Sequence, residues 1–194
     1  DFISYSFIFI ADTHGFLDDF KKQKEIINIF NPEYVLAECL QERVLDNTKE
    51  YKEIRDKKEI SEMVSWDEVK ALIIFCEKKK IKLIGMDLKN FGFNKNLQKI
   101  VKGEKEPTAT EEKEMKEILQ RRQKRHGEIC KQYKGKTKQP IVVIIGAWHL
   151  QESSQLMQEL TNYLVIYPTN KDGTMLMSPE GKKEDVQYEQ REKK

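Results

Sequence analysis

Cysteine is scarce in this sequence, and long apolar runs do not occur in it. Only three cysteines are found among 194 residues, and none forms a C-x-x-C pair. A disulfide framework or a zinc knuckle is therefore not expected, and a reducing compartment is favoured. No apolar run reaches the roughly 18 residues of a membrane helix, and no signal-peptide pattern is present. We expect a cytoplasmic protein without a membrane segment.

Charge of one sign is not in excess either. Lysine and arginine total 35 residues against 33 aspartates and glutamates, which gives a formal net charge of +2. The two signs are interleaved along the chain, so nothing predicts a nucleic-acid partner. Composition leaves the oligomeric state open.

Short apolar runs alternate with stretches of helical periodicity. The apolar runs predict strands over residues 2–10, 33–37, 81–84, 141–145 and 163–167. Helical spacing and capping-box patterns predict helices over residues 16–30, 41–58, 65–80, 108–133 and 151–162. This alternation is typical of an α/β fold with a mostly parallel central sheet and helices on both faces. We expect one compact domain over residues 1–178.

Three segments carry weaker patterns. Residues 90–107 are rich in glycine, asparagine and lysine, which predicts a long surface loop or a partly mobile flap. The segment Met175–Met177 predicts a short edge strand. Residues 179–194 are polar and charged, which predicts a disordered tail.

Ionisable residues follow four of the predicted strands. Because parallel strands end at the same edge of a sheet, we expect the side chains after them to converge, and ligands bind at that edge in open α/β sheets. Two of the three histidines in the chain fall at these positions. The residues are Asp12 and His14 after the first strand, Glu38 after the second, Asp87 after the third and His149 after the fourth.

Two imidazoles and one or two carboxylates form a usable ligand set for a divalent metal such as manganese, zinc or cobalt. We predict His14, Glu38 and His149 as the ligands, with Asp87 as a further ligand or general base. Such a metal would activate water and polarise a carbonyl group. Arg43 and one arginine of residues 121–125 are candidates to bind a substrate carboxylate or an oxyanion.

Structural roles compete with these interpretations. A histidine after a strand is ordinarily a loop or core residue, whereas a carboxylate beside buried strand residues, such as Glu38, needs a partner. Asp87 would equally cap the segment that follows it. Trp148 is either a lid over the pocket or a packing residue. His126, in the middle of a predicted helix, is expected to be exposed or packed rather than catalytic.

The order of these motifs resembles the TraB/Tiki superfamily, which includes the ChaN-like and erythromycin-esterase-like proteins. The matching pieces are two G-x-x-H-like motifs, a glutamate with a nearby arginine, and a G-x-D motif. In this chain they are Ala11–His14, Glu38 with Arg43, Gly85–Asp87 and Gly146–His149. Ala11 stands where the family has glycine. The family also carries an arginine on the helix before the last motif, and Arg122 matches that position best.

The branches of this superfamily imply different functions. Resemblance to the Tiki proteins implies a metal-dependent peptidase that uses the two histidines and the glutamate. Resemblance to the erythromycin esterases implies a metal-free esterase, and the ChaN-like branch implies haem or iron binding. Our first hypothesis is a metal-dependent hydrolase, of the Tiki type, acting on a peptide or a small-molecule carbonyl substrate. The alternatives are a non-catalytic peptide- or haem-binding protein and a metal-free esterase.

Overall fold

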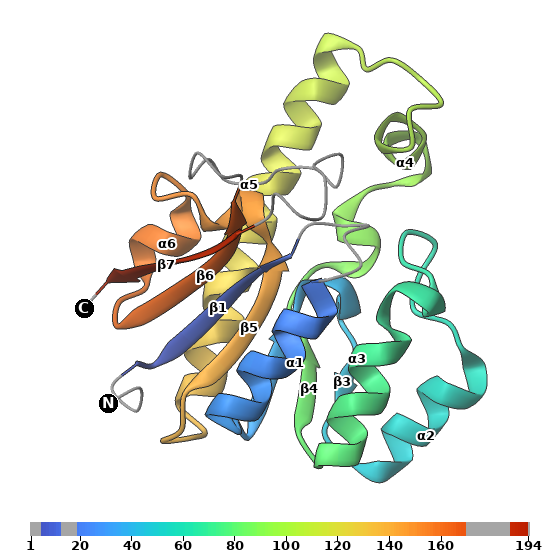
Figure 1. Ribbon diagram of the computed structural model, residues 1–194. Helices are drawn as coiled ribbons and strands as arrows, with labels where there is room; N and C mark the ends of the chain where they lie inside the picture. The colour runs from blue at the N-terminus through green and yellow to red at the C-terminus, as the bar shows by residue number, and fades with distance from the viewer. Residues whose placement is uncertain (1–4, 13–18, 170–186, 194) are drawn as a thin grey trace.

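The computed structural model describes residues 5–12, 19–169 and 187–193 of the chain. Seven strands form one sheet in the order β3-β4-β2-β5-β1-β6-β7 (Figure 1). Their bounds are β1 Phe7–Asp12, β2 Tyr34–Ala37, β3 Val44–Leu45, β4 Lys82–Gly85, β5 Ile141–Gly146, β6 Tyr163–Thr169 and β7 Gln187–Lys193.

The five inner strands are parallel, and the two edge strands are antiparallel. In the register of the sheet, Ala37 of β2 lies opposite Gly85 of β4, and Asp12 of β1 lies opposite Gly146 of β5. The edge strand β3 runs antiparallel to β4, and β7 runs antiparallel to β6. The predicted α/β class with a mostly parallel central sheet is therefore confirmed.

Alternate side chains of the inner strands enter two cores, one on each face of the sheet. On β5, Val142 and Ile144 face one core, whereas Val143 and Ile145 face the other. The first core is closed by α1 (Asp19–Phe30), α2 (Thr48–Lys57) and α3 (Trp66–Lys79). The second is closed by α5 (Ala109–Lys134) and α6 (Gln155–Glu159), on the opposite side of the sheet (Figure 1). Helices cover both faces, as expected.

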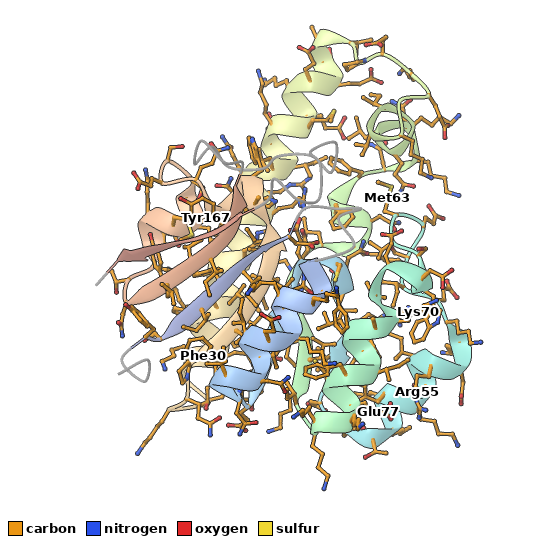
Figure 2. All side chains as sticks on the ribbon, viewed as in Figure 1. Phe30, Arg55, Met63, Lys70, Glu77 and Tyr167 are labelled. Atoms are coloured by element: carbon orange, nitrogen blue, oxygen red, sulfur yellow. The ribbon has the colours of Figure 1, made fainter. Side chains whose placement is uncertain are left out.

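Local sequence signals account for where the longer helices begin. The predicted capping boxes are present at α3, where Ser65 pairs with Glu68, and at α5, where Thr108 pairs with Glu111. The ion pair between Arg55 of α2 and Glu77 of α3 joins two neighbouring helices, with Arg55 Nε 3.0 Å from a Glu77 oxygen (Figure 2). Among the described helices, none has the length and apolar character needed to span a bilayer.

Two segments differ from the prediction. Residues 41–58 form the short strand β3 and then α2, rather than one helix, because Asn47 accepts hydrogen bonds from the amides of Lys49 and Glu50 and so starts the helix there. Residues 90–107 contain α4 (Lys95–Val101) instead of a continuous loop. Asn94 caps this helix, and its seven residues are too few to show a clear apolar period.

The end of the chain also differs from the prediction over the residues that the structure describes. Residues 187–193 fall in the predicted disordered tail, yet they form β7. Strand pairing uses backbone hydrogen bonds, and charged residues are common on edge strands, so hydropathy does not reveal such a strand. The predicted strand Met175–Met177 lies outside the described residues.

Candidate active site

The candidate site lies at the carboxyl edge of the sheet, where β4, β2, β5 and β1 end next to one another. Glu38 begins the 3₁₀ turn η2 (Glu38–Leu40) after β2, and His149 lies in η4 (Ala147–Leu150) after β5. Asp87 follows β4. Strands β2 and β5 bring residues 38 and 149 together although they are far apart in sequence. The predicted convergence at this edge is therefore present for these three residues.

Glu38 is buried and uses both of its carboxylate oxygens. Its Oε2 accepts a hydrogen bond from the backbone amide of Gly146 at 2.6 Å. Its Oε1 lies 2.5 Å from Nη2 of Arg122 and 3.4 Å from Nε2 of His149. The amide at the end of β5 thus fixes the orientation of the carboxylate, and the other oxygen carries the charged contacts.

Asp87 is fully buried and is held more tightly still. The fork of Arg122 donates from Nε to both oxygens, at 3.1 and 3.0 Å, and from Nη2 to Oδ2 at 2.7 Å. The amide of Leu88 donates to Oδ1 at 2.6 Å, so Asp87 also caps the segment after it. Arg125 donates from Nε to the Asp87 carbonyl at 3.2 Å. A bidentate arginine fork is among the stronger polar contacts in proteins.

A second histidine, His126, completes the group. Its Nε2 lies 3.0 Å from Oδ2 of Asp87, but the alignment is not that of a hydrogen bond. Its ring meets the ring of His149 edge to face, with centroids 5.0 Å apart. We call this group the acid–imidazole cluster, and its members are Glu38, Asp87, Arg122, His126 and His149.

Two imidazoles of the acid–imidazole cluster have unused nitrogens. Within the described part of the chain, Nδ1 of His149 and both nitrogens of His126 are buried without a hydrogen-bond partner. Ionised Glu38 is an acceptor, so the neighbouring Nε2 of His149 carries the hydrogen. This assignment leaves the lone pair of His149 on Nδ1.

The charges in the acid–imidazole cluster shift the pKa values of its acids. Burial raises the pKa of Glu38, but His149, Arg122 and His126 outweigh burial, and the pKa of that carboxyl lies well below its ordinary value. At Asp87, burial is likewise outweighed, by His126 and Arg122, and the pKa is lowered. Burial lowers the pKa of Arg122, whereas Asp87 and Glu38 raise it, with a net increase. Both acids and the guanidinium are therefore charged at neutral pH.

An unusual loop covers the guanidinium of Arg122. Within η3 (Lys89–Gly92), Asn90, Phe91 and Gly92 have φ values of 50°, 55° and 77°. The backbone amide of Asn90 donates to Oε1 of Gln41 at 2.8 Å, which anchors the loop. This backbone places the ring of Phe91 4.9 Å from the Arg122 guanidinium carbon. For a bulky residue such as phenylalanine, the left-handed conformation costs about 1–2 kcal/mol, and backbone strain of this kind is concentrated at functional sites.

The structure places the predicted site residues unequally. Glu38, Asp87, Arg122 and His149 meet in the acid–imidazole cluster. His14 lies outside the described residues.

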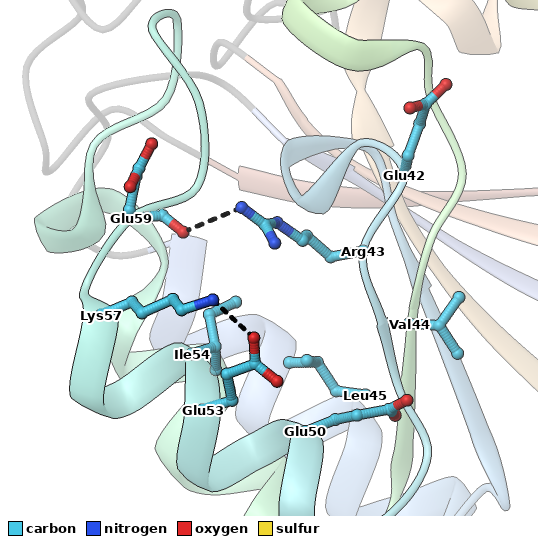
Figure 3. A pocket seen from close by; sticks show the side chains of 9 residues that line it. All are labelled: Glu42, Arg43, Val44, Leu45, Glu50, Glu53, Ile54, Lys57 and Glu59. Carbon is cyan, nitrogen blue, oxygen red and sulfur yellow. Dashed lines mark hydrogen bonds and ion pairs between the residues drawn. The ribbon is translucent and has the colours of Figure 1, made fainter.

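Arg43 lies apart from this group. Its guanidinium donates to the backbone carbonyls of Glu59 and Ile60, at 3.4 and 3.3 Å. It lines a separate pocket of about 290 Å³ between β3 and α2, shown in Figure 3. Among the described contacts, none joins Arg43 to the acid–imidazole cluster. Arg43 directly precedes the short strand β3, which pairs with β4. The sequence did not reveal that strand.

His126 is packed, which is one of the two alternatives expected for it, but its membership of the acid–imidazole cluster was not predicted. It is fully buried, against Asp87 and His149. A usable signal was present, because residues four apart on a helix share a face and His126 follows Arg122 by four positions on α5. Once Arg122 was a candidate, its helical neighbour was one as well.

The described residues do not fit a divalent metal. Among them, no group of three or more histidine, cysteine, aspartate or glutamate side chains is arranged to hold a metal ion. Both oxygens of Glu38 are engaged, and the guanidinium of Arg122 lies against it at 2.5 Å. A divalent ion about 4.5 Å from that guanidinium would be repelled by on the order of 7 kcal/mol at an effective dielectric constant of about 20. Arg122 supplies positive charge to both Glu38 and Asp87, and the predicted ligand His14 lies outside the described residues, so the metal site stays a prediction.

Comparisons of the chain with protein-family models, with curated proteins and with solved structures return no match. The resemblance to the TraB/Tiki superfamily therefore rests on the motifs alone and stays a hypothesis.

Proposed function

We propose that this protein is a metal-independent hydrolase of carboxylic esters, in which His149 is the general base and Glu38 is its partner. The contact that supports this proposal most directly is the one between Glu38 Oε1 and His149 Nε2, at 3.4 Å. A carboxylate beside one imidazole nitrogen orients the ring and stabilises the cation formed when the other nitrogen accepts a proton. The metal-dependent peptidase of our first hypothesis is less well supported, because Arg122 already neutralises the acids.

The chemistry follows from the unpartnered nitrogen of His149. Nδ1 accepts a proton from water as the water oxygen bonds to the carbonyl carbon of the ester. When the bond between carbon and leaving oxygen breaks, the same proton passes from Nδ1 to that oxygen. Ester and water thus become acid and alcohol, and the imidazole returns to its neutral state. Glu38 stays ionised throughout, because its pKa lies well below the ordinary value.

The other members of the acid–imidazole cluster act as positioning residues. Arg122 fixes the Oε1 atom of Glu38, and Asp87 fixes Arg122 through its bidentate contact. His126 packs its ring against that of His149. The Nε and Nη2 donors of the arginine are committed to two buried acids, and through them it orders Glu38.

Hydrolysis of phenyl acetate by the wild type and by His149→Gln tests this proposal. We expect kcat to fall by about 10²–10⁴ in the variant, the usual contribution of a general base. Lys131→Gln, which removes an exposed ion pair with Glu159 on α5 and α6, is the control and should keep the wild-type rate. A rate for His149→Gln within a factor of two of the wild type would refute the role of His149.

The same samples distinguish the binding alternative. A peptide- or haem-binding protein would show a ligand-dependent rise in Tm with no ester turnover. A wild type that turns over phenyl acetate no faster than buffer, but is stabilised by haem or a peptide, would replace the hydrolase proposal with a binding function.

A further inference from the structure

Trp148 is the half-exposed member of an otherwise buried turn. In η4, Ala147, His149 and Leu150 are buried, whereas Trp148 is 47% exposed. The turn is fixed by Ser154, whose hydroxyl donates to the carbonyl of His149 at 2.7 Å. The largest apolar side chain of this turn is therefore presented to solvent on a rigid support, next to the proposed general base.

The indole is also oriented with respect to the imidazole. The rings of Trp148 and His149 meet edge to face, with centroids 5.9 Å apart and planes at 84°. This contact uses the edge of one ring against the face of the other, and it leaves indole surface available for a second partner. Flat apolar groups stack on such surfaces with centroids roughly 4.5–7 Å apart.

Trp148 differs in position from the other large apolar side chains exposed in the described part of the chain. Those are Ile29, Val44, Ile74 and Val101, carried by α1, β3, α3 and α4. Single exposed apolar residues are ordinary and need no function. Trp148 is the one whose ring contacts a member of the acid–imidazole cluster.

We infer that Trp148 forms a subsite for an aromatic group of the substrate, which makes aryl esters the substrate class of the proposed hydrolase. This inference rests on the proposed function, since it concerns the same site. The indole centroid lies 5.9 Å from that of the imidazole, so an aromatic ring bonded directly to the ester would stack on the indole while the ester lies on the imidazole side of that ring. An ester of an aliphatic alcohol and an aliphatic acid lacks that contact.

Binding is tested without turnover, with acetophenone as an aryl ketone that has no ester bond to break. The two tryptophans of the chain give two indole N–H signals in a ¹⁵N-labelled sample, and Trp66→Phe assigns them. We expect acetophenone to shift the Trp148 signal in a saturable way, while the Trp66 signal stays in place and 2-butanone has little effect. A Trp148 signal that responds to neither ketone, or equally to both, would overturn the inference.

Kinetics provide the second readout. Trp148→Ala should raise KM for phenyl acetate by roughly 5- to 10-fold more than it raises KM for ethyl acetate, the size expected for one aromatic contact. Ile29→Ala is the matched control, because it removes an exposed apolar side chain from α1 and should alter neither ester. Equal changes for both esters would overturn the subsite. If no ester is turned over but acetophenone shifts the Trp148 signal selectively, the subsite stands and the hydrolase proposal fails.

Discussion

Removal of the guanidinium of Arg122 is the perturbation with the largest expected effect on stability. Arg122→Met replaces the arginine by an apolar side chain of similar length. It leaves Glu38 and Asp87 without the cation that they contact. The side chains of these acids are only 6% and 0% exposed, so water cannot replace the lost contact. Breaking a buried ion pair by removing one partner costs about 3–5 kcal/mol. We expect the free energy of unfolding to fall by that amount.

Urea denaturation, monitored by far-ultraviolet circular dichroism, measures this loss in the free energy of unfolding. For a chain of this size, the change corresponds to a fall in Tm of about 6–20 °C. Arg55→Met is the matched control, since it breaks an ion pair with Glu77 whose side chains are 43% and 25% exposed. Exposed pairs contribute about 1 kcal/mol or less. If the two variants lose equal stability, Arg122 does not hold a buried charge network.

The difference in unfolding free energy between the wild type and Arg122→Met should depend on pH. The pKa values of Glu38 and Asp87 are lowered in the folded protein, so their contribution to stability is present above the unfolded pKa of about 4 and is lost as pH falls through the folded values. Arg122→Met removes the part of this contribution that comes from the guanidinium, while His149 and His126 stay in place. The gap in stability between wild type and variant should therefore be widest near pH 7 and narrow steadily in acid. A gap that is independent of pH between 3 and 7 would contradict the charge assignment.

Two further predictions concern backbone packing and thiol reactivity. A Cβ atom on Gly85 would lie 2.2 Å from the backbone carbonyl oxygen of Gln41, so Gly85→Ala should destabilise the protein by more than about 2 kcal/mol. Gly135→Ala, where a Cβ meets nothing closer than 3.5 Å, should be neutral in the same urea titration, and equal losses would refute the packing argument. Burial raises the pKa of Cys76 and Cys130 to about 12. Both thiols should resist Ellman's reagent at pH 8 until urea unfolds the chain, and rapid reaction of the native protein would be inconsistent with this burial.

The parallel centre of the fold could be predicted from the sequence because its pattern is local. Apolar runs such as Ile141–Ile145 leave few alternatives to a buried strand, and the capping boxes at Ser65 and Thr108 mark where helices begin. The edges of the sheet could not be predicted in this way. The two residues of β3 and the charged residues of β7 pair through backbone hydrogen bonds, which leave little pattern in hydropathy.

The members of the acid–imidazole cluster that directly follow strands could be predicted from the sequence. Glu38, Asp87 and His149 follow three neighbouring strands, so the topology alone brings them to one edge. What the sequence could not supply was the side-chain geometry, in which Arg122 contacts both acids. His126 was missed because its burial depends on tertiary contacts of α5 with Asp87 and His149.

Dependence on metal is the most direct test of the central claim that Arg122 neutralises Glu38 and Asp87 while His149 acts as the base. The measurement is the rate of phenyl acetate hydrolysis by wild-type protein after dialysis against excess chelator, with and without added manganese or zinc. Because the carboxylate oxygens are already engaged by Arg122 and by the amide of Gly146, we predict the same rate in chelator alone, after addition of manganese and after addition of zinc. Loss of activity in chelator and its recovery on addition of either metal would contradict this account.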